Sequence, residues 1–174
     1  ASIRRKDILP TAVKTLETTS SHNCTSLTEI SLPDSVSTIN YSAFEGCSAL
    51  SAINYPLNLS STGGGIFLGC TSLHTITVPE GVTTLPASVF SSASALTEIH
   101  LPESLTTIGS SAFLSIKTLT EISIPSHVTS IGSTAFENCS RMARLRSYGV
   151  ETIAATAFMG CSKLTDISLP DSLT

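Results

Sequence analysis

Five cysteines are the residues of this chain whose type and spacing could organise chemistry. Cys24, Cys47 and Cys70 follow one another at intervals of 23 residues, and Cys139 and Cys161 lie 22 residues apart. Thiolates act as nucleophiles and zinc ligands, and two thiols can form a disulfide. Zinc sites commonly use Cys-x-x-Cys pairs, which this sequence lacks, and an odd number of cysteines leaves at least one of them unpaired.

Other reactive side chains form no site that the sequence identifies. No Gly-x-Ser-x-Gly motif is present, and the run Gly63–Gly65 is not followed by the Lys-Ser/Thr of a phosphate loop. None of the four histidines lies three or four residues from another metal ligand on an evident shared helix: His22, His74, His100 and His127. We therefore predict no catalytic residue, no cofactor and no metal ion.

The cysteine spacing belongs to a 23-residue repeat that covers nearly the whole chain. Self-similarity at such a period is typical of a solenoid, in which each repeat forms one coil and packs on its neighbours. We divide residues 1–174, as a single array, into an atypical copy at 4–26, copies at 27–49, 50–72, 73–95, 96–118, 119–141 and 142–163, and a partial copy at 164–174. The array is expected to be a piece of a longer one.

Apolar residues define which positions of the repeat face inward. Counted from the leading Leu, they recur at positions 1, 4, 6, 10, 13, 17 and 18, as Leu96, Ile99 and Leu101 illustrate for the first three. The alternation around position 4 predicts a short strand, and the proline at position 7 ends it because proline lacks the amide donor. Positions 10 to 18 predict extended or turn structure and then one short 3₁₀ or helical turn at the Ala-Phe pair.

The cysteines all occupy position 21 of this repeat, where two other copies carry Ala93 and Ile116. Replacement by small or aliphatic residues is typical of a buried packing position, and free cysteine behaves as a small apolar residue. Neighbouring coils would place these Cα atoms about 5 Å apart, which a disulfide allows. Their side chains point in the same direction along the column, however, so we predict five buried thiols.

Two copies of the repeat, Leu96–Thr118 and Leu119–Arg141, carry the pattern LxxIxLPxSVxxIGxxAFxxCxx most clearly. This pattern resembles the BspA-type leucine-rich repeat, which occurs in surface proteins of host-associated bacteria and of mucosal protist parasites. The resemblance implies a right-handed leucine-rich-repeat solenoid of the α/β class. A parallel strand ladder would form its concave face, and short turns its convex side.

The resemblance also implies a function. The chain is expected to be a non-enzymatic protein-interaction module of a cell-surface or secreted, adhesin-like protein, with a host or extracellular matrix protein as partner. The alternative is a structural spacer or a cytoplasmic scaffold, and a third reading is a regulatory segment of an enzyme.

Composition excludes some kinds of partner. The net charge is −4, only 13% of the residues are charged, and no basic run is present, so nucleic acid is not an expected partner. No apolar stretch reaches the length of a membrane span, so we expect no membrane insertion by this segment.

The outward positions of the predicted strands are the candidate binding surface, because the inward positions are committed to folding. Acidic residues at position 3 give way to two arginines near the C-terminal end, and no aromatic residue lies there, which favours polar, weak or multivalent contacts. The candidate residues are Glu29, Ser31, Asn54, Thr75, Thr77, Glu98, His100, Glu121, Ser123, Arg144 and Arg146.

Three copies depart from the repeat, and we expect irregular structure in each. The first copy has Arg4 and Asp7 at inward positions and Ser21 in place of Phe. The second full copy has Thr62 in place of an aliphatic residue, followed by three glycines that predict a loosened turn. The 22-residue copy has Ser147-Tyr148 where the others have an aliphatic residue and proline.

Overall fold

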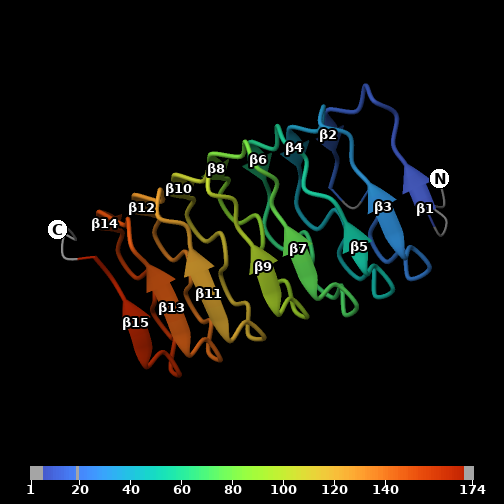
Figure 1. Cartoon of the computed structure of the whole chain (residues 1–174). Helices are drawn as coiled ribbons and strands as arrows, with labels where there is room; N and C mark the ends of the chain where they lie inside the picture. The colour runs from blue at the N-terminus through green and yellow to red at the C-terminus, as the bar shows by residue number, and fades with distance from the viewer. Residues whose placement is uncertain (1–5, 19, 171–174) are drawn as a thin grey trace.

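The computed structural model describes residues 6–18 and 20–170, which form a solenoid of stacked coils with two strands in most coils (Figure 1). The first strand of each coil begins at position 3 of the repeat. These strands are β1 (Lys6–Ile8), β3 (Glu29–Ser31), β5 (Ala52–Ile53), β7 (Thr75–Thr77), β9 (Glu98–His100), β11 (Glu121–Ile124), β13 (Arg144–Ser147) and β15 (Asp166–Ser168).

The second strand of each coil lies at positions 12 and 13, in the region where the sequence predicts extended or turn structure. These strands are β2 (Thr15–Leu16), β4 (Thr38–Ile39), β6 (Ser61–Thr62), β8 (Thr84–Leu85), β10 (Thr107–Ile108), β12 (Ser130–Ile131) and β14 (Thr152–Ile153). All strand pairs are parallel, and the register joins equivalent repeat positions, such as Ile122 with Leu145 and Thr84 with Thr107. The predicted leucine-rich-repeat solenoid with a parallel ladder is confirmed.

The predicted 3₁₀ or helical turns are wrong for the described residues, where the Ala-Phe pairs lie in hydrogen-bonded turns without a helix. In this turn region, positions 16 and 20 both have positive φ: Ser111 has φ 58° and Ser115 has φ 61°. A helix needs consecutive residues in the right-handed region, so these two left-handed residues interrupt it. Within residues 6–18 and 20–170, no helix has the length and apolar character of a membrane span.

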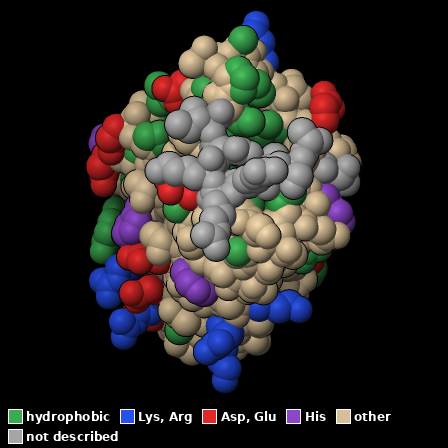
Figure 2. Space-filling model, turned by 90° about the vertical axis from the view of Figure 1, so that its right-hand side faces the viewer, with side chains coloured by type: hydrophobic (Ala, Val, Ile, Leu, Met, Phe, Trp, Pro, Cys, Tyr) green, Lys and Arg blue, Asp and Glu red, His purple; other side chains and the backbone are tan. Residues whose placement is uncertain are grey.

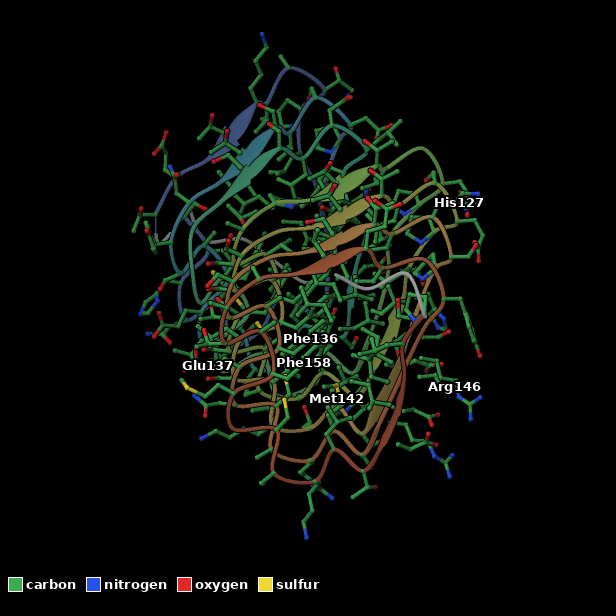
Figure 3. All side chains as sticks on the ribbon, turned by 90° about the vertical axis from the view of Figure 1, so that its left-hand side faces the viewer. His127, Phe136, Glu137, Met142, Arg146 and Phe158 are labelled. Carbon is green, nitrogen blue, oxygen red and sulfur yellow. The ribbon has the colours of Figure 1, made fainter. Side chains whose placement is uncertain are left out.

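The core is a set of columns that run along the solenoid axis, as the repeat predicts. Rings at position 18 stack from coil to coil, with centroids 4.7 Å apart for Phe113 and Phe136 and 5.5 Å apart for Phe136 and Phe158. Figure 3 looks along this axis and places Phe136 and Phe158 inside the coil, with Glu137 and Arg146 on opposite outer sides. Phe44, Phe90, Phe113 and Phe136 are fully buried.

Neighbouring coils are also joined by backbone hydrogen bonds on the turn side. The amide of Phe113 donates to the carbonyl of Ala135 at 2.8 Å, and the amide of Ser115 donates to the carbonyl of Glu137 at 2.7 Å. Equivalent bonds join most other neighbouring coils, so a regular interface between coils has two strand ladders and a turn ladder.

One interface between coils breaks this pattern, and we call it the seam. It lies between coil 50–72 and coil 73–95, where neither β5 with β7 nor β6 with β8 is paired. Apart from the connecting turn, in which Leu73 donates to Cys70, no backbone–backbone hydrogen bond joins these two coils in the described part of the chain. The seam divides the solenoid into an N-terminal stack (residues 6–18 and 20–72) and a C-terminal stack (residues 73–170).

A second and smaller break affects only the first strands. β9 and β11 are not paired, whereas β10 and β12 in the same two coils are. The turn that leads into β11 contains Ile116 at position 21, and it is a bend, not the hydrogen-bonded turn found in the other coils. The sequence predicted neither this break nor the discontinuity of both ladders at the seam.

The three predicted irregularities have different outcomes. Arg4 lies outside the described residues, but β1 and β2 pair regularly with β3 and β4, so the first copy is not distorted there. Ser21 is buried in the place of the ring. The 22-residue copy also pairs on both sides, because Gly149 lets its shortened loop lie against the backbone of Ser126.

One glycine of the second full copy, Gly63, is needed for close packing, whereas a Cβ at Gly64 or Gly65 would make only ordinary contacts, at 3.6 Å and 3.9 Å. A Cβ at Gly63 would lie 2.7 Å from the Cα of Tyr41 in the preceding coil, which a real side chain does not tolerate. Gly63 is therefore required where the backbones of coils 27–49 and 50–72 approach each other. The irregularity of coil 50–72 lies on its other side, at the seam.

Candidate functional site

The predicted binding residues all lie at positions 3 or 5 of the first strands, on what we call the first-strand face. Inward residues alternate with them, so that Ile122 and Ile124 are buried while Glu121 and Ser123 are exposed. Ten of the eleven are exposed, and Glu29 is half-buried. Along the left edge of Figure 2, acidic, basic and histidine side chains alternate on this side of the molecule.

Asn54 is exposed but is committed to the fold. Its Nδ2 donates to the carbonyl of Leu32 at 2.7 Å, and its Oδ1 accepts from the amide of Leu32 at 2.7 Å. The side chain thus replaces the strand bonds that β5 would otherwise make at this position, and β5 ends at Ile53. Asn54 is therefore the weakest member of the predicted set.

A groove of about 470 Å³ lies on the first-strand face where β9 and β11 do not pair. Ile99 and Ile122 form its floor, because both are inward residues that the separated strands leave near the surface. Its walls carry predicted residues from three coils: Glu98, His100, Glu121, Ser123, Arg144 and Arg146. The structure therefore brings together six of the eight predicted residues that lie in the C-terminal stack.

Ion pairs connect several of these charged side chains. Arg144 Nη1 lies 3.8 Å from Glu121 Oε2, and Arg144 Nε lies 3.5 Å from Asp166 Oδ2. Arg146 Nη2 lies 4.0 Å from the same oxygen of Asp166. Asp166 was not among the predicted residues, although position 3 of the last, partial copy was the signal that could have found it.

Charge on the other wall of the groove depends on a histidine. His100 Nε2 lies 3.3 Å from Glu98 Oε1, and both side chains are more than half exposed. With neutral His100, the carboxylate of Glu98 has no cation within ion-pair distance among the described residues. The groove therefore has an acidic wall at Glu98 and a wall of mixed charge around Arg144.

The other five predicted residues, from both sides of the seam, line a second groove. It has a volume of about 370 Å³, and Ser31, Thr75 and Thr77 line it together with half-buried Glu29. Apart from the carboxylate of Glu29, the polar side chains that line it are hydroxyl and amide groups. The predicted residues thus form two grooves that differ in charge, one at each break in the first-strand ladder.

The cysteines have a structural role that the sequence did not reveal. The Sγ atoms of Cys47, Cys70 and Cys139 donate to the carbonyl at position 18 of the preceding coil, and the distance is 3.1 Å for Cys70 to Phe44. Burial raises the pKa of Cys70 and of Cys139 to about 12, and that of Cys47 to about 11. Thiols that stay protonated are poor nucleophiles and metal ligands.

All five cysteines are free thiols, as predicted, but two of them are only half-buried. Cys24 and Cys161 lie in the first and last described coils that carry position 21, so they are packed from one side only. No cluster of three or more His, Cys, Asp or Glu side chains in residues 6–18 and 20–170 is arranged to hold a metal ion.

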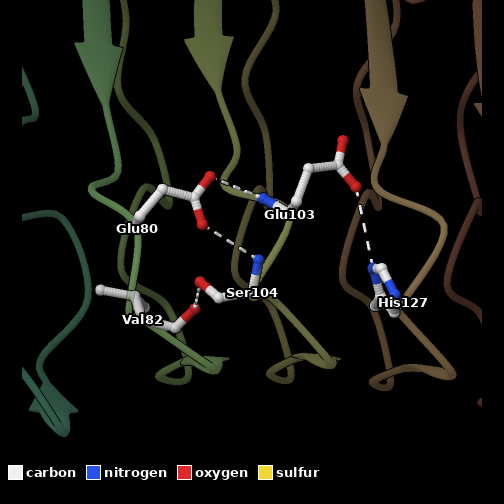
Figure 4. Close-up of polar contacts among 5 residues, drawn as sticks. All are labelled: Glu80, Val82, Glu103, Ser104 and His127. Atoms are coloured by element: carbon white, nitrogen blue, oxygen red, sulfur yellow. Dashed lines mark hydrogen bonds and ion pairs between the residues drawn. The ribbon is translucent and has the colours of Figure 1, made fainter.

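Carboxylates at position 8 stabilise the coil that follows them (Figure 4). Glu80 accepts from the amides of Glu103 at 3.0 Å and Ser104 at 3.3 Å. Asp34 accepts in the same way from the amide of Leu57 at 3.1 Å. Glu103 lies 3.8 Å from His127 instead. These carboxylates are bound within the fold, so this edge is a poor candidate for a second charged site.

Comparisons with known proteins agree with this architecture. The family model described as "BspA type Leucine rich repeat region" matches residues 14–143 and 144–174, with 6 copies. Among curated protein sequences, none matches this chain with significance.

Three solved structures share the fold. A leucine-rich repeat protein of T. pallidum is 29% identical with a TM-score of 0.69, and the alignment covers 93% of this chain and 78% of that one. A leucine-rich repeat protein of Bacteroides ovatus ATCC 8483 is 26% identical with a TM-score of 0.75, and the alignment covers 97% of this chain and 46% of that one. A protein of Faecalibacterium prausnitzii A2-165, described as a leucine rich cell surface protein, is 26% identical with a TM-score of 0.57. Here the alignment covers 97% of this chain and 62% of the other. The chain thus spans less than two thirds of the last two proteins.

Proposed function

The chain belongs to the BspA type leucine-rich repeat family, and from this we infer that it is a non-enzymatic module whose first-strand face binds a partner protein. The observation that carries the proposal is the groove between β9 and β11 with charged walls of both signs. Solenoids present such extended faces because each coil contributes the same outward positions. Charged side chains that are exposed and vary from coil to coil contribute little to folding and can specify a partner.

The partner that fits this groove is a polar protein surface with charges of both signs. A cationic side chain would lie against Glu98 and the acidic side of the groove, and an acidic one against Arg146. Aromatic side chains are missing from the outward positions of the face, so we expect weak individual contacts that gain strength when several coils or several copies are engaged.

We further propose that the chain is part of a cell-surface or secreted, adhesin-like protein that binds a host or extracellular matrix protein. The description of the F. prausnitzii protein as a cell surface protein supports this location. The alternative, a structural spacer, predicts that the same face has no partner.

The proposal is tested with the labelled chain on an array of purified extracellular matrix and host cell-surface proteins. The variant Glu121→Lys with Arg144→Glu reverses one ion pair of the groove and conserves the net charge, although it also removes the ion pair of Arg144 with Asp166. We expect binding to any captured protein to weaken by about tenfold or more, because charge pairs at interfaces set specificity. Both side chains are exposed, so the stability of the fold should change by less than about 1 kcal/mol even with the loss of the pair between Arg144 and Asp166.

The control variant Lys117→Glu with Glu137→Lys makes the same exchange on the turn side of neighbouring coils. It should leave binding unchanged. Loss of binding in this control but not in the groove variant would contradict the proposed face. An array on which no protein retains the chain above serum albumin would favour the spacer.

A further inference from the structure

The seam combines several independent departures from the regular interface, and each has a cause in the sequence. Pro86 occupies position 14, where Gly109 and Gly132 donate an amide hydrogen bond to the carbonyl of the preceding coil. Proline has no amide proton, so this bond is absent at the seam. Leu57 occupies position 8, where Asp34 and Glu80 accept amides of the following coil, so that contact is absent as well.

The aromatic column is also interrupted at the seam. Phe44 stacks on Phe67 at 6.0 Å and Phe90 stacks on Phe113 at 5.6 Å, but Phe67 and Phe90 are not stacked. Tyr55 occupies position 6, which is aliphatic in most copies, and its ring tilts by 51° against Phe90 at 6.2 Å. The ring of Tyr55, which is larger than the aliphatic side chains of most other copies, thus lies in the core between the N-terminal and C-terminal stacks.

Side-chain hydroxyls replace the missing backbone bonds across the seam. Thr62 Oγ1 donates to the carbonyl of Ala87 at 2.5 Å. Ser91 Oγ accepts from the amide of Gly65 at 3.1 Å, and Ser94 Oγ accepts from the amide of Gly69 at 3.3 Å. Rotatable side chains tolerate displacement better than a backbone ladder, in which all bonds must shift together.

Open space lies on both sides of the seam. The groove of about 370 Å³ opens on the first-strand face. A groove of about 340 Å³, lined by Leu57, Ser60 and Thr83, opens on the second-strand side. A small apolar cavity of about 10 Å³ lies beside Tyr55, Phe67 and Phe90. In Figure 3, the blue-to-teal arrows of the N-terminal stack lie apart from the green-to-orange arrows of the C-terminal stack.

From these observations we propose that the seam is a joint, at which the N-terminal and C-terminal stacks move relative to each other as two rigid bodies. The ladders keep each stack rigid. Apolar packing such as that of Tyr55 on Phe90, the three hydroxyl contacts and the connecting turn hold the stacks together. Because grooves open on both sides, bending can narrow one groove while it widens the other. Such motion would change the curvature of the first-strand face, and it does not depend on whether that face binds a protein.

Amide hydrogen exchange in the unmodified protein gives the first test. We expect amides around Thr62 to Phe67 and Thr83 to Ser88 to exchange at least about tenfold faster than those around Ile108 to Phe113, because local opening determines protection. Equal protection would contradict the joint.

Distances between spin labels give the second test, because unpaired amides would exchange quickly even in a rigid seam. Four exposed residues at position 11 serve as label sites: Ser60, Thr83, Thr106 and Thr129. The pair Ser60→Cys with Thr106→Cys spans two interfaces, one of which is the seam. The control pair Thr83→Cys with Thr129→Cys spans two interfaces within the C-terminal stack, and both variants also carry Cys24→Ala and Cys161→Ala.

The labels of either pair lie about 10 Å apart by strand spacing. We expect the distance distribution across the seam to be about twofold wider than that of the control, as rigid-body motion at an interface requires. Equal widths would overturn the proposal whatever the exchange rates.

Discussion

Two interfaces of one solenoid show what holds coils of a repeat protein together. Between coils 96–118 and 119–141, the rings of Phe113 and Phe136 stack at 4.7 Å, and backbone bonds join the second strands and the turns. At the seam, the ring column and all three ladders are interrupted. The apolar positions are largely the same in both, so burial alone does not produce a continuous solenoid; a few positions that supply donors, acceptors and ring size decide it.

The largest expected effect of this difference concerns the aromatic column. Phe136→Ala should lower the free energy of unfolding by about 3–5 kcal/mol, because the ring is fully buried between Phe113 and Phe158. The loss for Phe67→Ala should be smaller than that for Phe136→Ala by at least about 1 kcal/mol. The reason is that Phe67 stacks on one ring only and its other side faces the seam. Urea denaturation followed by circular dichroism measures both values. Equal losses would show that the seam is packed as tightly as the C-terminal stack.

The buried thiols should make stability fall at alkaline pH. Burial raises the pKa of Cys70 and Cys139 from 9.0 to about 12, so above pH 9 the unfolded chain releases protons that the folded chain keeps. The free energy of unfolding should therefore be unaffected by these thiols below pH 9. It should fall between pH 9 and 12, by about 1.4 kcal/mol per pH unit for each thiol.

The control for this prediction is the variant Cys70→Ala with Cys139→Ala, which position 21 should accept because Ala93 occupies it naturally. Other groups also titrate in this range, so the measured quantity is the difference in slope between the two proteins. A variant with the same alkaline slope as the natural chain would contradict the raised pKa of both thiols.

A smaller effect should follow from copying one feature of the seam onto a regular interface. Glu80→Leu reproduces Leu57 at position 8 and removes the acceptor for the amides of Glu103 and Ser104. We expect a loss of about 1 kcal/mol in the free energy of unfolding, because these bonds are exposed. Glu103→Leu is the matched control. Among the described residues the carboxylate of Glu103 pairs only with His127, at 3.8 Å, so this variant should change stability by less than about 0.5 kcal/mol. If both variants behave alike, position 8 does not distinguish the seam.

Much of the fold follows from the repeat itself. Inward columns, the strand that proline ends and the parallel register are periodic features, and a period is visible in one sequence. The Ala-Phe pair was misjudged because its turn depends on positive φ at the polar residues of positions 16 and 20, such as Ser111 and Ser115. Serine favours turns through several conformations, so its type alone does not fix φ.

The seam was harder to predict because it depends on pairs of residues in different coils. Thr62 and the glycines marked coil 50–72 as unusual, but their sequence does not show which neighbour is affected. Gly63 packs closely on Tyr41 in the preceding coil, whereas Thr62 bonds to Ala87 in the following one. Pro86 and Leu57 were not singled out in the sequence. The missing amide donor of Pro86 and the missing acceptor at Leu57 matter only because, among the described residues, no other backbone–backbone hydrogen bond joins these two coils outside the connecting turn.

Prediction of the candidate site succeeded for side-chain direction and failed for contacts. The period-2 alternation places Glu121 and Arg144 outward, and the structure agrees. Neither the groove, which depends on the unpaired strands, nor the use of Asn54 as a backbone substitute can be derived from alternation.

The smallest expected effect concerns Tyr55→Phe, which removes the hydroxyl at the seam and keeps the ring. The Oη atom of Tyr55 is buried without a hydrogen-bond partner among the described residues, and burial raises the pKa of this hydroxyl well above its usual range. Desolvation of an unpaired hydroxyl opposes folding, so Tyr55→Phe should leave stability unchanged or increase it by up to about 1 kcal/mol. Tyr148→Phe, at a tyrosine that is 63% exposed, should change stability by less than about 0.5 kcal/mol. Because the ring remains, exchange at the seam should stay fast in Tyr55→Phe. A loss of more than about 1 kcal/mol together with faster exchange at the seam would mean that the hydroxyl joins the two stacks through a polar contact.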